Sequence, residues 1–260
     1  MIAALLAATA AASALVPASA GTSPGRLPPL ALAASPTRLV LSGTAWSTVR
    51  VTNPGRAPVD VATSATGFAL DLSGRPHAVA ARSGEAPDWV VVSPRRIHLG
   101  AGRSAYVTVS ARAPRRASPG EHDALLLLQT RMRAVGPVPI VMQVGVVIVV
   151  RVKGPTIHRL EIRSLRVRRL ARRRLLLLTI RNRGNVAEVL PRRRLRVVLR
   201  RGRRLVATLL PPRRELLPRS LGVISMRYAG GARGALTAIV VLQRPRVGVA
   251  AVRRSFRIRL

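Results

Sequence analysis

A short pattern that occurs twice constrains the fold of this chain more than any other feature of its sequence. In the first copy, residues 48–52 alternate between apolar and polar side chains, and Asn53-Pro54-Gly55 follows directly. Alternation with a period of two predicts a strand with one apolar face. Pro followed by Gly predicts a type II turn with a positive φ at Gly55, which the Asn53 side chain would fix by bonding the backbone two residues on. The alternation resumes at residues 59–61, so the stretch predicts a hairpin.

The second copy of this pattern lies 129 residues further along the chain. Residues 176–181 alternate again, Asn182-Arg183-Gly184 supplies the turn, and a second short strand is predicted to follow. Two copies of one supersecondary unit predict two domains of one architecture. A chain of 260 residues is long enough for two domains of roughly 110 residues each. We expect the Asn, Pro and Gly residues of both turns to set strand geometry rather than to bind a ligand.

Short alternating segments separated by turn residues make up the rest of the chain. The clearest is Ser104–Arg112, whose odd-numbered residues are all apolar, and Gly202 predicts a hairpin between two later strands. The hydrophobic content of 48% is sufficient for packed cores, and no segment has a convincing helical period. The pattern predicts an all-β fold with two tandem immunoglobulin-like antiparallel β-sandwiches, over residues 35–153 and 154–260. Lys153-Gly154-Pro155 marks the expected boundary.

The first 20 residues predict a secretory signal peptide. They are apolar and end in Ala18-Ser19-Ala20, a small-residue cleavage pattern, and the Pro- and Gly-rich residues 21–34 predict a linker. An uncleaved membrane anchor is the alternative, although polar residues and a proline within the segment weaken it. No second segment predicts a membrane span, so we expect a protein secreted to the cell envelope. The chain has no cysteine, which excludes disulfides and thiol chemistry.

The formal net charge of +36 is carried almost entirely by arginine, since Lys153 is the single lysine among 45 basic residues. A preference for Arg over Lys is typical of GC-rich genomes, so part of this charge reflects codon usage. Residues 154–260 hold 29 of the basic residues. A solvated strand face explains this clustering, and so does an anion-binding face, because guanidinium groups match phosphate and carboxylate geometry. The candidate anion- or polymer-binding residues are Arg192, Arg193, Arg194, Arg200, Arg201, Arg203 and Arg204.

The sequence contains no recognisable catalytic, metal-binding or nucleic-acid-binding motif. It has four histidines and nine acidic residues, and no G-x-S-x-G, H-E-x-x-H or phosphate-binding loop. Glu121-His122-Asp123 resembles a metal cluster, but alternate residues of a strand point to opposite faces, so the three cannot reach one ion. No aromatic residues are interleaved with the Arg runs, as binding of single-stranded nucleic acid would require. We expect no enzyme, no cofactor, no metal and no specific nucleic-acid partner.

Trp89 has two interpretations. The apolar run Trp89–Val92 ends at Pro94 and predicts a buried strand, with the indole ring packed between two sheets. The alternative is an exposed platform on which a sugar ring stacks. The valines that follow favour the core position, so we group Trp89 with the structural residues Asn53, Pro54, Gly55, Asn182 and Gly184.

Several of these residues together resemble a known bacterial family. Over roughly residues 35–154, the chain is similar to the immunoglobulin-like, peptidoglycan-binding domain of WxL-interacting proteins, which are cell-surface proteins. The resemblance implies a second immunoglobulin-like domain that binds a host or partner protein, and residues 155–260 are similar to that domain only in the Asn182 turn and the number of strands. The matching pieces are Ser35-Pro36, Val51–Gly55, Trp89–Pro94, Leu99–Gly102, Pro119–His122 and Gly145–Gly154.

These observations predict a secreted, non-catalytic binding protein of a high-GC Gram-positive cell envelope. Its expected partner is a cell-wall polymer (peptidoglycan or an anionic glycopolymer), a surface protein, or both. One alternative is an assembly factor, like a periplasmic chaperone, that adds a strand to a client protein. This alternative predicts a long unprotected edge strand within Val138–Val152. Another alternative is an adhesin whose Arg face holds anionic polymers without specificity.

Overall fold

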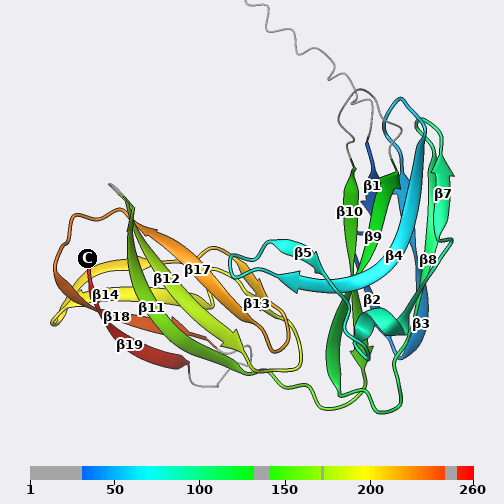
Figure 1. Cartoon of the computed structure of the whole chain (residues 1–260). Helices are drawn as coiled ribbons and strands as arrows, with labels where there is room; N and C mark the ends of the chain where they lie inside the picture. Colours follow the sequence, from blue (N-terminus) through cyan, green and yellow to red (C-terminus); the bar gives the residue numbers. More distant parts are fainter. Residues whose placement is uncertain (1–30, 132–140, 171–172, 244–250) are drawn as a thin grey trace, which may run out of the picture.

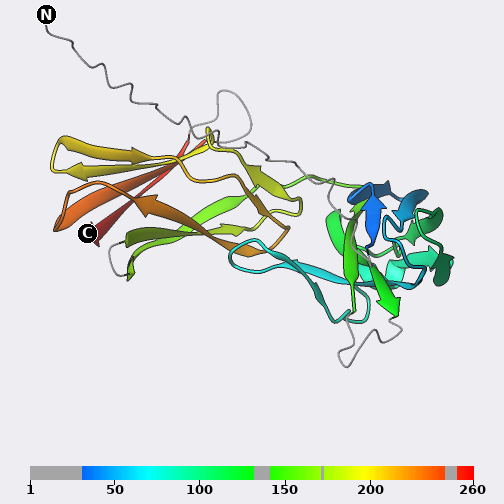
Figure 2. The ribbon, with the colours of Figure 1, turned by 90° about the horizontal axis from the view of Figure 1, so that it is seen from above.

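A computed structural model describes residues 31–131, 141–170, 173–243 and 251–260, whose regular secondary structure is β-strand with one exception. The exception is one turn of 3-10 helix at Ala86–Trp89. The predicted signal peptide and most of the predicted linker lie outside the described residues. In the part of the chain that the structure describes, no helix is long and apolar enough to cross a membrane. Figures 1 and 2 show that the strands gather into an N-terminal and a C-terminal half.

The N-terminal half is built from two sheets whose inward side chains form one hydrophobic core. The first sheet has the order β1-β3-β8-β6, and the second has the order β2-β10-β9-β4-β5, with β7 also paired to β4. The strands of the first sheet are β1 (Ala33–Ser35), β3 (Thr44–Thr52), β6 (Val90–Ser93) and β8 (Ser104–Arg112). Those of the second are β2 (Arg38–Ser42), β4 (Val59–Leu70), β5 (Pro76–Val79), β7 (Arg96–Leu99), β9 (Gly120–Arg131) and β10 (Gln143–Val152).

The C-terminal half has its own core, which shares no residue with the first. Its sheets have the orders β11-β12-β17, β13-β16 and β15-β14-β18-β19. The first two sheets contain β11 (Leu160–Leu170), β12 (Arg173–Asn182), β13 (Glu188–Leu190), β16 (Arg214–Leu216) and β17 (Leu221–Tyr228). The third contains β14 (Leu195–Arg201), β15 (Arg204–Leu209), β18 (Ala235–Leu242) and β19 (Val252–Arg259). The all-β, antiparallel class predicted from alternation is therefore what the described residues show, and β2 with β10 is a parallel pair.

The predicted turn at Asn53 is confirmed in one respect and wrong in two. The backbone N–H of Gly55 donates to Asn53 Oδ1 at 2.9 Å, as expected for an Asn that closes a turn. However, Gly55 does not have a positive φ, so the turn is not type II. Moreover, β3 and β4 belong to different sheets, so the stretch is a crossing between two layers and not a hairpin.

The side-chain amide of Asn53 explains this crossing. It is fully buried, and its Nδ2 donates to the carbonyls of Ala57, Leu99 and Gly100 at 2.8, 3.1 and 3.1 Å. Leu99 ends β7, which pairs with the start of β4, so one amide ties the end of β3 to the facing sheet. Without it, the buried carbonyl of Leu99 would lose this partner, which is costly, whereas the carbonyl of Gly100 also accepts from the N–H of Arg103.

Asn182 makes the same set of bonds in the C-terminal half. Its Oδ1 accepts from the N–H of Gly184 at 2.8 Å, and its Nδ2 donates to the carbonyls of Val186, Leu216 and Leu217 at 2.8, 3.2 and 3.1 Å. Asn182 ends β12, and the chain then enters β13 in a different sheet. The repeated sequence pattern therefore marks a repeated layer crossing.

Other sequence predictions are confirmed with small shifts in their bounds. The strand Ser104–Arg112 has the predicted bounds, and Gly202 joins β14 to β15 with a φ of 54°. Trp89 lies in the core, as preferred, but in the 3-10 turn before β6 rather than in the strand.

We expect Asn53→Ala to lower the free energy of unfolding by about 3 kcal/mol, because it leaves several buried backbone groups without partners. Asn53→Asp keeps the acceptor for Gly55 but sets a carboxylate against three carbonyls, so it should destabilise at least as much. Urea unfolding measures both, with Thr108→Ala on the exposed face of β8 as the control. If Asn53→Asp were as stable as the natural protein, the bonds from Nδ2 would not matter.

Candidate functional site

The hairpin formed by β4 and β5 reaches from the N-terminal half onto the C-terminal half (Figures 1 and 2). At its tip, the carbonyl of Leu72 accepts a hydrogen bond from the backbone N–H of Val223 in β17 at 2.7 Å. The guanidinium of Arg214 donates from Nη2 to the carbonyls of Asp71 and Leu72 at 3.1 and 3.0 Å. Gly74 has a φ of 90°, and a Cβ there would lie 1.3 Å from Arg214 Nη1. The hairpin tip therefore holds the Arg214 guanidinium of the C-terminal half through two carbonyls, and Gly74 leaves the space that this group occupies.

Arg214 is unusual among the arginines of this chain because its side chain is buried. Burial lowers the pKa of the guanidinium, and the nearby Asp71 carboxylate opposes that shift. No carboxylate bonds it directly, since its acceptors are backbone carbonyls, and Nε has no hydrogen-bond partner. A buried charge held by carbonyls is sensitive to geometry, so the hairpin tip has little freedom to move.

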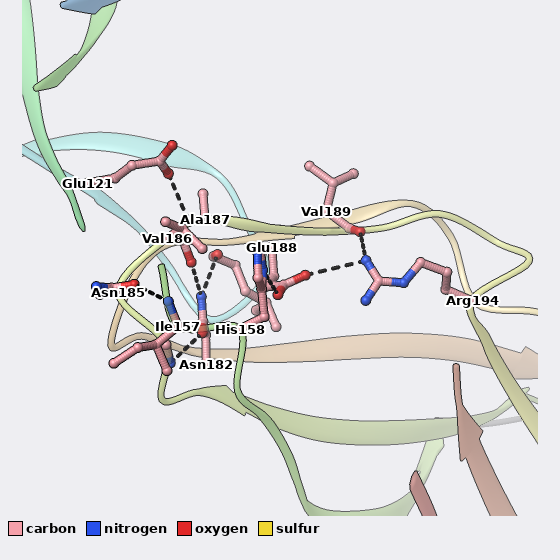
Figure 3. Close-up of polar contacts among 12 residues, drawn as sticks. Glu121, Ile157, His158, Asn182, Asn185, Val186, Ala187, Glu188, Val189 and Arg194 are labelled. Carbon is pink, nitrogen blue, oxygen red and sulfur yellow. Dashed lines mark hydrogen bonds and ion pairs between the residues drawn. The ribbon is translucent and has the colours of Figure 1, made fainter. Parts of the chain in front are cut away.

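A second set of contacts joins the halves at the start of β9 (Figure 3). The N–H of Glu121 donates to the carbonyl of Asn185 at 2.7 Å, and Glu121 Oε2 accepts from the N–H of Ala187 at 2.7 Å. Asn185 Nδ2 donates to the carbonyl of Pro119 at 3.0 Å. Gly120 has a φ of 120°, and a Cβ there would lie 2.3 Å from the Asn185 carbonyl oxygen. The two halves therefore meet both at the hairpin tip and at this second set of contacts.

A groove of about 740 Å³ lies beside the hairpin tip, which contributes Ser73 and Gly74 to its lining. Its floor consists of outward-facing side chains of the second sheet, and its far wall and rim come from β16 and the residue before it. Arg38 of β2 bridges the rim through an ion pair with Glu215, at 2.6 Å between Arg38 Nη2 and Glu215 Oε1. The apolar floor residues are Phe68, Leu70, Leu125, Leu127 and Val147.

One edge of β10 is open where it borders this groove. β10 pairs with β9 along its whole length, but β2 covers its other edge only from Val147 to Arg151. Gln143–Val146 therefore has no strand on that side among the described residues. The N–H of Val147 donates to the carbonyl of Thr37 on the β2 side at 3.0 Å. Because hydrogen-bonding groups alternate along a strand, the N–H of Gly145 also points to the open side.

The sequence predicted a long unprotected edge within Val138–Val152. The described part of that edge is four residues long, since β2 covers the remainder of β10. Residues 138–140 lie outside the described part of the chain.

Asp123 lies where the halves meet, beside the groove. Burial, followed by the nearby Glu121 carboxylate, raises the pKa of Asp123 to about 7; Glu215 adds to this shift and Arg38 opposes it. Its Oδ1 has no hydrogen-bond partner in the structure. Asp123 is therefore neutral in part near pH 7. Among the described residues, no group of three potential ligands could hold a metal ion.

The predicted anion-binding arginines do not form one cluster. Arg192 and Arg193 precede β14, whereas Arg200 and Arg201 end that strand and Arg203 and Arg204 follow it, roughly 20 Å away. Arg194 is already used within the fold, because Nη1 donates to Glu188 Oε2 at 3.3 Å and to the Val189 carbonyl at 3.1 Å (Figure 3). Arg201 donates to the carbonyl of Arg233.

The sequence interpretation missed the two most exposed aromatic side chains, Trp46 and Tyr106, which are 72% and 64% exposed. Both lie on the outer face of the first sheet. The alternation already contained this information, because Trp46 is in phase with Arg50 and out of phase with the buried Val49. Trp89, in contrast, is 8% exposed, with its ring centroid 4.8 Å from that of His122, so it offers no open face for a sugar.

Several solved structures are similar to this chain over most of its length. A class 5 fimbriae chaperone, CfaA, is 11% identical, with 86% of this chain and 98% of that chain covered and a TM-score of 0.48. The YadV chaperone is 13% identical, with 87% and 98% covered and a TM-score of 0.47. A chaperone–tip subunit complex from the Csu pili of Acinetobacter baumannii is 12% identical, with 88% and 98% covered and a TM-score of 0.45.

These TM-scores and identities are too low for any inference about function. No family model matches the chain, and no curated protein matches it. The resemblance to WxL-interacting proteins therefore stays a prediction.

Asp123 should make the protein less stable as the pH rises. The folded protein retains this proton up to about pH 7, whereas an unfolded Asp loses it near 3.8, so unfolding releases a proton between these values. Stability is therefore lost as pH rises through that window. Asp123→Asn should match the natural protein at pH 4 and exceed it at pH 8, by up to about 4 kcal/mol.

Urea unfolding at pH 4, 6 and 8 measures this difference, with the exposed Glu85→Gln as the control. A stability difference between Asp123→Asn and the natural protein that is independent of pH would show that Asp123 ionises normally.

Proposed function

We propose that this chain is a non-catalytic envelope protein that binds an extended segment of a partner protein by strand addition at the open edge of β10. The observation that carries the proposal is the position of this edge, because no described strand pairs with Gln143–Val146 on the side opposite β9, where it borders the groove. An unpaired strand edge is a template for another strand. The proposal corresponds to the assembly-factor alternative from the sequence.

The backbone of β10 would supply affinity. The N–H groups of Gln143 and Gly145 point to the open side, and an added strand would pair with them as β2 pairs with the residues that follow. The described open edge extends roughly 13 Å, which matches about four residues of a partner strand. Such a short contact is weak unless side chains also bind.

The groove would supply selectivity, because alternate side chains of the added strand would face its floor. Leu127 is directly opposite Gly145 in the register of β9 and β10. A Cβ at Gly145 would lie 2.9 Å from Leu125 Cδ1, so the glycine leaves the floor accessible to the partner. The groove should therefore prefer a segment whose alternate residues are apolar.

We also propose that the two halves are separate immunoglobulin-like domains with a boundary near Lys153, exported by the predicted signal peptide. Their separate cores support this division, and cooperative unfolding of residues 31–153 expressed alone would check it. A cell-wall polymer as ligand and a Gram-positive source remain predictions, because no described feature and no comparison favours them.

Hydrogen exchange with a synthetic peptide tests strand addition. The probe is a peptide that alternates Val with Ser and Thr, and the matched control peptide has the same composition with its valines adjacent. The alternating peptide should slow exchange at the amides of Gln143 and Gly145 by at least about tenfold, because these amides gain acceptors. The control peptide should protect them less.

Leu127→Glu should weaken peptide binding at least about tenfold, since it sets a charge on the apolar floor. The matched variant is Val91→Glu, which adds the same charge to an exposed position on the other sheet and should bind normally. Thermal melting confirms that both variants fold. Unchanged exchange at Gly145 with a saturating peptide, or equal losses in both variants, would overturn the proposal.

A further inference from the structure

The outer face of the sheet β15-β14-β18-β19 carries two rows of arginine. In the register of this sheet, Arg196 of β14 is aligned with Val241 of β18 and with Arg253 of β19. Arg200 is aligned in the same way with Thr237 and Arg257. Aligned residues of neighbouring strands point to the same face, and the opposite face is the core. Side chains that are far apart in the sequence therefore stand on one surface. Figure 1 shows β14, β18 and β19 in the same part of the C-terminal half.

This surface has no acidic residue to balance its charge. The four strands of the sheet contain no Asp or Glu, and their outward arginines take part in none of the ion pairs that the described residues form. All of these arginines are exposed. The members of this surface, which we term the arginine track, are Arg196, Arg200, Arg253, Arg257 and Arg259.

Shorter side chains lie between the two rows of the arginine track. β18 lies between the two rows, and its outward residues, Ala235, Thr237, Ile239 and Val241, have short side chains. The rows stand two strand spacings apart, about 10 Å, and successive arginines within a row are roughly 7 to 13 Å apart. Val241 is only 7% exposed although it faces outward, which we attribute to the stems of the flanking arginines.

We propose that the arginine track binds a linear polymer that carries phosphate groups, laid along β18 between the two rows. Guanidinium forks bind phosphate oxygens in pairs, and the two rows present such forks to both sides of one chain. Two rows of charge on either side of one strand fit a narrow chain laid between them better than they fit a flat lipid surface. The site is separate from the groove at β10, so it adds a second ligand to the proposed function.

The arginine track differs from the set expected from local Arg runs. It shares only Arg200 with that set, because Arg192–Arg194 and Arg201–Arg204 lie at the ends of strands. The two rows form because β14, β18 and β19 pair with one another, and not because their arginines are adjacent in the sequence.

Binding of inorganic polyphosphate, measured by fluorescence anisotropy over a series of salt concentrations, tests the proposal. The test variant replaces Arg196, Arg200, Arg253 and Arg257 with Ser. The control variant removes the same charge from exposed arginines of the N-terminal half, by replacing Arg50, Arg95, Arg103 and Arg112 with Ser. Melting temperatures confirm that both variants fold.

The natural protein should bind polyphosphate with an affinity that falls steeply as salt rises. The test variant should lose at least about tenfold in affinity and show a shallower salt dependence, whereas the control variant should change less than about twofold. Equal losses in both variants would show that only net charge matters and would overturn the proposal. Binding of phosphatidylglycerol vesicles without binding of polyphosphate would overturn it in favour of a membrane surface.

Both variants should still bind the alternating peptide at β10. Failure of polyphosphate binding with peptide binding intact would therefore remove the arginine track alone. The reverse result would remove the strand-addition function alone.

Discussion

The contact between Arg214 and the tip of the β4–β5 hairpin is the interaction on which the proposed binding groove depends. Two carbonyls of the tip accept from one guanidinium, and Gly74 leaves the space that it occupies. The contact between Glu121 and Asn185 and the ion pair between Arg38 and Glu215 also join the two halves. The groove floor and its far wall come from different halves, so its width is set by these contacts and not by either core.

The junction between the two halves is polar, which limits how much free energy it contributes to stability. Its bonds are mostly from backbone groups and charged side chains, with Arg214 and Asp123 held out of water. Such groups gain little net free energy on burial but tolerate little displacement. A junction of this kind specifies an orientation more strongly than it stabilises the fold. That property suits a groove whose ligand needs a strand edge and an apolar floor at a fixed spacing.

Local patterns predicted the strands but not the contacts that assemble the groove. Alternation predicts β8 with its observed bounds, and the Asn-x-Gly pattern lies at both layer crossings. The sequence predicts a hairpin at the first crossing, because a turn sequence does not reveal which sheet the next strand joins. Two of these contacts join residues that are far apart in the sequence. The hydrogen bond between Leu72 and Val223 spans 151 positions, and the ion pair between Arg38 and Glu215 spans 177. No local pattern in the sequence predicts such pairs. Runs of Arg in the sequence do not predict the arginine track for the same reason. Its two rows form between residues of different strands, which only the pairing of the strands brings together.

The central claim is that the junction holds the two halves in one orientation, so that the groove exists before a partner binds. The chain has no cysteine, so spin labels can be placed on Tyr106→Cys in β8 and Ser225→Cys in β17 without competing sites. Double electron–electron resonance between them should give one narrow distance distribution, and Arg214→Ala should broaden it. A broad distribution in the natural protein, unchanged by Arg214→Ala, would contradict the account.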